Sequence, residues 1–178
     1  MQIPVLTTER LTLRAVRADD FDDCLALWTD PVVTRYISGI LSTGDHTWGR
    51  LQRYAGMWQL LGYGYWIVEE TASGRYVGDV GLGDHRRAME PSISGIPEVG
   101  WALKSAYFGR GYATEAVRAA LAWSDANLAD ASTVCIISPA NLASIRVAEK
   151  CGFGDSQIIS WNGDPALLLT RRASAVAS

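Results

Sequence analysis

Several classes of protein are disfavoured by what this sequence lacks. Its cysteines, Cys24, Cys135 and Cys151, are odd in number and show no metal-ligand spacing, so we expect neither a disulfide framework nor a metal site. With 16 basic and 19 acidic residues and no basic stretch, nothing indicates a nucleic-acid surface. No long apolar run with a charged lead indicates a signal peptide or a membrane span. These absences predict a cytoplasmic protein.

The remaining composition is typical of a soluble globular protein. The chain has 178 residues, of which 48% are hydrophobic and 20% charged. That length suits one domain with a sizeable core. We expect this domain to cover residues 1–172 and residues 173–178 to form a frayed tail.

Alternating and helical patterns predict a mixed α/β (α+β) fold. Strands are expected at 10–14, 65–69, 75–82, 98–103, 133–138, 158–161 and 167–170, and helices at 19–30, 44–61, 114–128 and 141–152. The strands that flank helix 114–128 are joined by a crossover and should be parallel neighbours, whereas the other connections are hairpins or meanders. The result is a mixed, mostly antiparallel twisted sheet with helices on both faces.

The most informative segment joins strand 98–103 to the helix that follows it. Gly109 and Gly111 leave the backbone open to a ligand, and the first amides of the helix lack partners within it, as in pyrophosphate sites. A P-loop would need Lys followed by Ser or Thr, where this chain has Tyr112 and Ala113, and a dinucleotide fingerprint would need a third glycine, where it has Thr114. A coenzyme A site or a simple tight turn remains open.

Two segments resemble the GNAT superfamily of N-acetyltransferases. Residues 108–113 fit its acyl-CoA loop, Gln/Arg-x-x-Gly-x-Gly/Ala, except that Phe108 replaces the polar first residue. Residues 136–153 are similar to the later part of that family, where Asn-x-x-Ser opens a helix that closes with Gly-Phe. Together with residues 8–14 the resemblance covers nearly the whole chain, and its form is similar to the branch that includes ribosomal-protein-alanine N-acetyltransferases.

The resemblance implies acetyl-CoA as the acyl donor, with no metal, and a parallel strand pair that splays apart. Backbone in the splayed region would pair with the pantetheine arm, loop amides would hold the pyrophosphate, and an asparagine would bond the pantetheine near the thioester. The cofactor-binding residues implied are Trp101, Ala102, Leu103, Phe108, Gly109, Arg110, Gly111, Tyr112, Ala113 and Asn141.

The same resemblance implies the catalytic residues. Glu98 is the candidate base, acting directly or through a water, and an amide at Ala102 or Leu103 is the candidate oxyanion donor. Many relatives protonate the leaving thiolate with a tyrosine at the position of Ala148, so Ser144 is the substitute that the resembling branch offers. Apart from the resemblance, His85 and His46, both in polar, turn-rich surroundings, are alternative bases.

The free energy of deprotonating an amine at pH 7 indicates which amines can be acetylated with little help from a base. At pH 7, deprotonating an α-amine with a pKa of about 7.7–8.0 costs roughly 1 kcal/mol, whereas a lysine costs about 4.6 kcal/mol. A weak base therefore suffices for a protein or peptide N-terminus or a similar small-molecule amine. We expect single-step transfer to such an acceptor by a monomer or homodimer, with no nucleic-acid or membrane partner.

Two other classes of function stay open. The chain would be a non-catalytic acyl-CoA-binding sensor if the loop worked without turnover. It would be an association subunit if its aromatic residues, concentrated between Trp28 and Tyr65, formed a contact surface. In the family that region walls the acceptor cleft, although aromatic residues at helical spacing are more often core.

Overall fold

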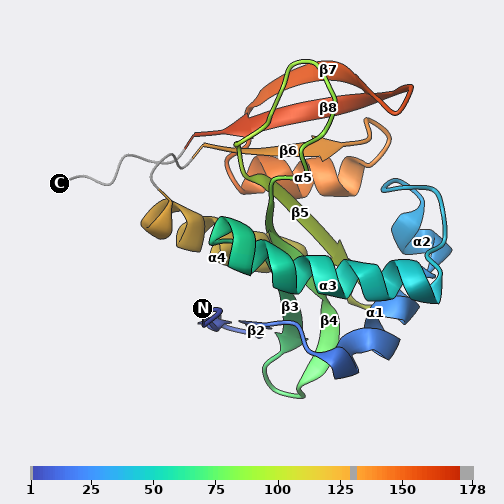
Figure 1. Ribbon diagram of the computed structural model, residues 1–178, viewed down its shortest axis with the longest axis vertical. Coiled ribbons are helices and arrows are strands. Elements are labelled where there is room, and N and C mark those ends of the chain that lie inside the picture. The colour runs from blue at the N-terminus through green and yellow to red at the C-terminus, as the bar shows by residue number, and fades with distance from the viewer. Residues whose placement is uncertain (1, 129–131, 173–178) are drawn as a thin grey trace.

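The computed structural model describes residues 2–128 and 132–172, which form one sheet with helices on both faces (Figure 1). The eight strands are β1 (Leu6–Thr7), β2 (Leu11–Arg14), β3 (Tyr65–Glu70), β4 (Arg75–Gly83), β5 (Glu98–Leu103), β6 (Thr133–Ile137), β7 (Asp155–Trp161) and β8 (Asp164–Arg171). Their order is β1-β2-β3-β4-β5-β6-β8-β7, and only β5 and β6 pair in parallel. The expected mixed, mostly antiparallel sheet is confirmed; the expected tail, 173–178, lies outside the described residues.

The helices are α1 (Phe21–Trp28), α2 (Pro31–Thr34), α3 (Gly44–Leu61), α4 (Tyr112–Asn127) and α5 (Leu142–Lys150), with short 3₁₀ turns at Ala18–Asp20 and Ser105–Tyr107. α3 has the predicted bounds. α4 begins two residues before the predicted Thr114, because Gly111 takes a φ of +81° and serves as its N-cap. The β7–β8 hairpin turns at Asn162 and Gly163, both with positive φ, as this residue pair predicts.

Two apolar cores lie on opposite faces of the sheet. The larger one packs α4 and Trp58 of α3 against β2, β3, β4 and β5, and the smaller one packs α1 and Leu51 of α3 against the other face. Side chains of β5 alternate between them: Val99 and Leu103 enter the larger core, whereas Ala102 enters the smaller. The strand therefore has one face toward α4 and one toward α3.

The parallel pair splays apart, as expected. β5 and β6 pair at one position, Glu98 with Val134, where the Val134 amide donates to the Pro97 carbonyl at 3.1 Å. Beyond that point the strands diverge toward their carboxyl ends. A gap in the middle of the sheet thus opens toward the loop that begins α4.

Candidate functional site

The hydrogen-bond register decides which β5 amides face this gap. The Lys104 amide donates to the Val77 carbonyl at 2.8 Å, and β5 pairs with β4 without a register shift. Amides alternate in direction along a strand, so the polar groups of Ala102 point to β4 and those of Val99, Trp101 and Leu103 point to the β6 side. Val99 borders the one position where β5 and β6 pair, whereas Trp101 and Leu103 lie beyond it and face the gap. Of the three residues expected along the pantetheine, two therefore present backbone donors and acceptors there.

The loop at the open end of the gap contains the two glycines at which a ligand is expected to approach the backbone. Gly109 and Gly111 have φ values of +75° and +81°, in the left-handed region that favours glycine. An added Cβ at Gly109 would meet nothing within 4 Å, so the outer side of the loop is open. Arg110 is exposed, and its guanidinium lies 5.4 Å from the centre of the Tyr107 ring. Phe108 is 52% exposed and therefore contributes little to the core.

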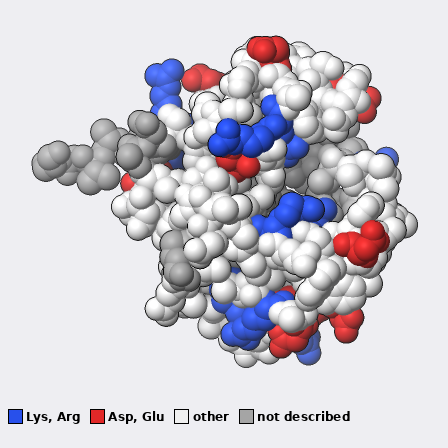
Figure 2. Space-filling view, viewed as in Figure 1, with Lys and Arg blue, Asp and Glu red and all other residues white. Residues whose placement is uncertain are grey.

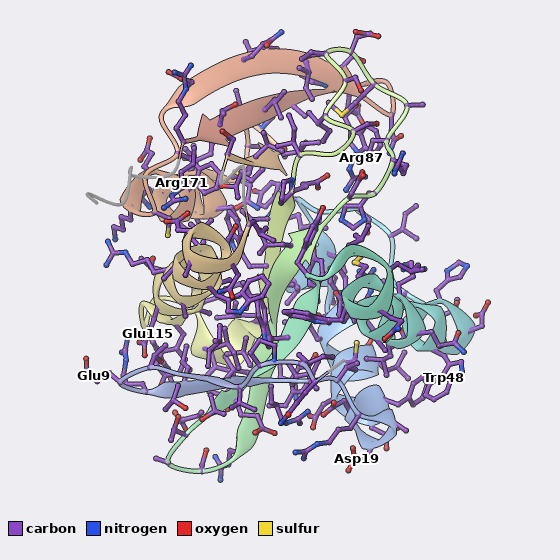
Figure 3. The ribbon with its side chains drawn as sticks, turned by 60° about the vertical axis from the view of Figure 1, so that its left-hand side comes forward. Glu9, Asp19, Trp48, Arg87, Glu115 and Arg171 are labelled. Carbon is purple, nitrogen blue, oxygen red and sulfur yellow. The ribbon has the colours of Figure 1, made fainter. Side chains whose placement is uncertain are left out.

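A brace from the N-terminal strands holds this loop. Glu115, in the first turn of α4, accepts hydrogen bonds from the Thr8 hydroxyl (2.6 Å), the Arg10 amide (2.9 Å) and the Arg10 Nε (2.8 Å). The Arg10 Nη1 donates to the Arg110 carbonyl at 2.9 Å. Figure 3 shows Glu115 and Glu9 at the same corner of the molecule. No pattern in the sequence connected Arg10 with Glu115, and the sequence analysis did not include Arg10 in the site.

Asn141 lies at the same carboxyl edge of the sheet, directly after β6. Its Oδ1 accepts the Ser144 amide at 3.1 Å and caps α5, as its residue type predicts. Ser144 is half-buried one turn into the helix, and Ala148 is fully buried where the family's tyrosine would stand. The structure thus brings Asn141 and Ser144 together at the start of α5.

Glu98, the candidate base, begins β5 at the closed end of the gap. It is buried and ion-paired: Arg87 donates to its two carboxylate oxygens at 2.6 and 2.8 Å. Arg87 comes from the loop 84–97 and lies 4.5 Å from the centre of the Trp161 ring (Figure 3). The loop is irregular, so no sequence pattern connected these two residues.

A floor of glycines runs along the face of β4 and β5 that is turned to α3. Glu98, Gly100 and Ala102 lie opposite Gly83, Gly81 and Asp79. An added Cβ at Gly100 would stand 2.3 Å from the Tyr65 hydroxyl, so the glycine is what admits this side chain. The Tyr65 ring stacks on Tyr54 at 4.4 Å, with planes 4° apart.

The aromatic residues of this region are divided between core and surface. Trp28, Tyr54, Trp58 and Tyr65 are buried, whereas Tyr36 and Trp48 are more than one third exposed. Most of them therefore build the wall behind the face of β4 and β5 and do not form an open contact surface.

His85 and α3 border a hollow beside this floor. At Gly83 an added Cβ would meet His85 Nε2 at 3.0 Å and Met57 Sδ at 3.3 Å, so these two side chains converge there. Burial lowers the pKa of His85. The positive charges of Arg87 and Arg53 lower it further, whereas the negative charge of Glu98 raises it. In Figure 2 the hollow lies above α3, with Lys and Arg side chains on two of its sides.

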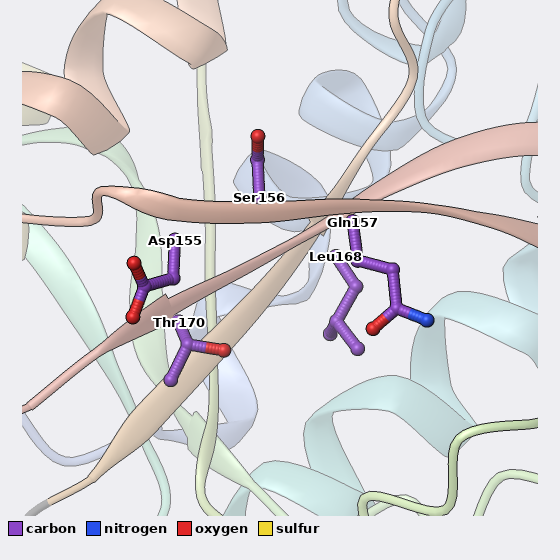
Figure 4. A pocket seen from close by; sticks show the side chains of 5 residues that line it. All are labelled: Asp155, Ser156, Gln157, Leu168 and Thr170. Atoms are coloured by element: carbon purple, nitrogen blue, oxygen red, sulfur yellow. The ribbon is translucent and has the colours of Figure 1, made fainter.

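The surface has two further depressions. One is lined by Asp155, Ser156, Gln157, Leu168 and Thr170 of the β7–β8 hairpin and contains no residue expected in the site (Figure 4). The other lies between the N-terminal strands and α4 and includes Gly111, Arg118 and Lys150, so it is continuous with the glycine loop.

Within the described ranges, 2–128 and 132–172, no cluster of three or more His, Cys, Asp or Glu side chains is arranged to hold a metal ion. The same residues include no helix with the length and apolar character that crossing a bilayer requires.

Comparison with known proteins gives a consistent picture. The family model of the acetyltransferase (GNAT) domain matches residues 10–154. An uncharacterized protein of Bacillus subtilis is 32% identical over 164 residues, which are 88% of this chain and 90% of that protein. A structure described as a GNAT-family acetyltransferase from Bordetella pertussis superposes with a TM-score of 0.84 at 33% identity, covering 95% of this chain and 99% of its own. An acetyltransferase from Agrobacterium tumefaciens gives 0.82 at 30% identity, covering 97% and 96%.

Proposed function

The chain belongs to the GNAT acetyltransferase family, acetyl-CoA-dependent acyltransferases, and we propose that it acetylates a primary amine of α-amine character by direct attack on the thioester. One observation carries the proposal: the gap between β5 and β6 opens onto the glycine loop. The unpaired edge of β5 and the unpaired amides at the start of α4 therefore lie along one continuous path. Each requires a polar partner, and an acyl-CoA offers amides to the first and phosphates to the second.

In this proposal the pyrophosphate lies on the amides of residues 109–113, at the positive end of α4. The pantetheine follows the edge of β5, where Trp101 and Leu103 direct their amides and carbonyls, and Asn141 bonds it near the thioester. Arg10 fixes the loop before the cofactor arrives, since it ties the Arg110 carbonyl to Glu115. A pre-organised loop loses less conformational entropy on binding.

A matched pair of glycine variants tests the cofactor site. Gly109 and Gly74, which lies in the β3–β4 turn, both have positive φ and open space around an added Cβ. Gly109→Asp places a carboxylate where the pyrophosphate should bind, and calorimetry with acetyl-CoA should show affinity reduced roughly tenfold or more, because the added negative charge repels the phosphates and opposes the charge-assisted hydrogen bonds of the loop amides.

Gly74→Asp is the control, because it carries the same backbone strain and the same charge away from the site. It should bind acetyl-CoA as the unmodified protein does. Equal affinities for the two variants would place the pyrophosphate elsewhere.

Proton transfer at the closed end of the gap is assigned to Glu98, through a water. Arg87 holds both carboxylate oxygens, so Glu98 is positioned to orient a water better than to approach the amine itself. The α-amine of a peptide needs little help, since its deprotonation at pH 7 costs roughly 1 kcal/mol. The α-amine of a free amino acid has a higher pKa, because its carboxylate stabilises the ammonium, and so it depends more on the base. Ser144 is assigned to protonate the thiolate, and the amide of Leu103 or Trp101 to stabilise the oxyanion.

The alternative base is His85, whose lowered pKa leaves it neutral, and able to accept a proton, at pH 7. Glu98→Gln and His85→Gln separate the two in pH profiles of kcat/KM. If Glu98 is the base, Glu98→Gln shifts activity to higher pH and His85→Gln leaves the profile in place. The reverse pattern assigns the base to His85. Thermal melts of both variants control for the broken ion pair.

Solved structures suggest two classes of acceptor without deciding between them. An aminoglycoside acetyltransferase in complex with coenzyme A and kanamycin shares the fold (TM-score 0.74) at 17% identity, and a structure named as a ribosomal-protein-serine acetyltransferase from Vibrio cholerae does so (0.71) at 16% identity. At such identities only the fold is shared. Thiol release should therefore be measured with peptides, polyamines, aminoglycosides and amino acids.

A further inference from the structure

Negative charge around the hollow above α3 is bound within the protein. The Glu98 carboxylate is held by Arg87. Asp84, with a side chain 5% exposed, accepts from the amides of Arg86 and Gly95 at 3.0 and 3.2 Å. Asp79 is 1% exposed and accepts the Trp28 indole N–H at 3.1 Å. None of these three carboxylates is therefore available to a cationic acceptor.

The positive charge on the α3 side is less completely bound: Arg50 is near enough to Asp79 and Tyr54 to interact with both, but it forms no salt bridge with any residue that the structure describes. Arg50, Arg53 and Met57 are three and four residues apart and so share one flank of the helix, the flank that meets His85. In the part of the chain that the structure describes, neither arginine forms an ion pair. The Arg50 guanidinium lies 3.5 Å from the centre of the Trp28 ring, and its buried Nε has no hydrogen-bond partner there.

We propose that the acceptor is a small amine with a carboxylate of its own, an amino-acid-like molecule, and that Arg50 and Arg53 bind this carboxylate. The inference rests on the proposed function and adds the chemical class of the acceptor. A guanidinium presents a planar fork of donors that matches a carboxylate, and stacking on Trp28 fixes the plane of Arg50.

The same charges discriminate against polycations. A polyamine would bring further positive charge beside two arginines that have no salt-bridge partner among the described residues, and it would find its potential carboxylate partners already bound. Like-charge contact and unsatisfied polar groups are the elements by which a site rejects a competitor. An acceptor with one amine and one carboxylate meets neither obstacle.

The test compares substrates that differ only in the carboxylate. Thiol release from acetyl-CoA is measured with a set of α-amino acids, with their α-amides and with spermidine. Rates are expressed per neutral amine, because amide formation lowers the pKa of the α-amine. A charge-assisted hydrogen bond predicts kcat/KM roughly tenfold or more higher for the acids than for the amides. Equal or faster reaction of the amides or of spermidine overturns the inference.

Variants assign the preference to the arginines. Arg50→Gln and Arg53→Gln should each reduce kcat/KM for the acids while leaving the amides unchanged, whereas Arg75→Gln, at the exposed start of β4, should alter neither. If both Arg50→Gln and Arg53→Gln still prefer the acids to the amides, the carboxylate is not bound by these arginines and the assignment is overturned. If no amine of any class releases thiol, the proposed acetyl transfer itself fails; if amines react but acidic peptides outperform free amino acids, only the inferred acceptor class is wrong.

Discussion

Asp79 provides a quantitative test of the buried face beneath α1 and α3. Its carboxyl lies on β4 opposite Ala102, is 1% exposed and accepts one hydrogen bond, from Trp28. Desolvation raises its pKa from the ordinary 3.8 to about 6, even though Arg50 and the Trp28 hydrogen bond act against the rise. The folded protein therefore holds this proton more tightly than the unfolded chain does.

The sign and size of the effect follow from linkage. Between pH 4 and pH 6 the folded state keeps a proton that the unfolded state releases, so stability falls as the pH rises. Above pH 6 the carboxylate is charged in both states, and the full penalty applies. A change from 3.8 to about 6 corresponds to about 3 kcal/mol. The Asp79→Asn variant lacks the charge but can still accept from Trp28, so it should escape this penalty.

The assay is urea unfolding, followed by tryptophan fluorescence, of the unmodified protein and Asp79→Asn between pH 4 and pH 8. The stability of the variant relative to the unmodified protein should rise by about 2.5 kcal/mol over this range, because part of the full effect lies below pH 4, and other titrating groups cancel in the difference. A flat or falling difference for Asp79→Asn would show that the buried carboxyl is not destabilised as described.

Two further predictions concern the site itself. Gly100→Ala should cost about 1–3 kcal/mol of stability through its clash with the Tyr65 hydroxyl. In a Tyr65→Phe background most of that cost should disappear, because the next ring atom is 3.3 Å away, and chemical denaturation of all four proteins checks the coupling. Ser144→Ala should lower kcat and keep acetyl-CoA affinity in calorimetry; an unchanged kcat would remove Ser144 from the mechanism.

Local features of the site were predictable from sequence because each depends on neighbouring residues. Gly109 and Gly111 take the positive φ that glycine alone adopts easily, and Asn141 caps the helix that follows it. The α3 bounds and the Asn162–Gly163 turn follow from similarly local rules. The splay was also expected, although through family resemblance and not through local chemistry.

Long-range partners were not predictable in the same way. Arg10 and Glu115 are 105 residues apart, and nothing near either one specifies the other. Arg87 reaches Glu98 from an irregular loop, where no periodicity shows which side chains face inward. The β4–β5 register decides which backbone amides face the gap. Because a long irregular loop, and not a tight turn, joins these strands, the sequence does not reveal that register.

That register also explains how two substrates can meet at one strand. The amides of Val99, Trp101 and Leu103 point within the plane of the sheet, toward β6, whereas Glu98 and Gly100 face out of the plane, toward α3. We therefore expect the acyl donor to bind along the edge of β5 that faces β6, and the acceptor to bind over the face of β5 that is turned to α3. Gly100 has no side chain to block the path from the β5 edge to the face that is turned to α3, and the Tyr65 hydroxyl lies where its Cβ would be. We therefore expect the thioester to lie beside Gly100, where donor and acceptor can meet.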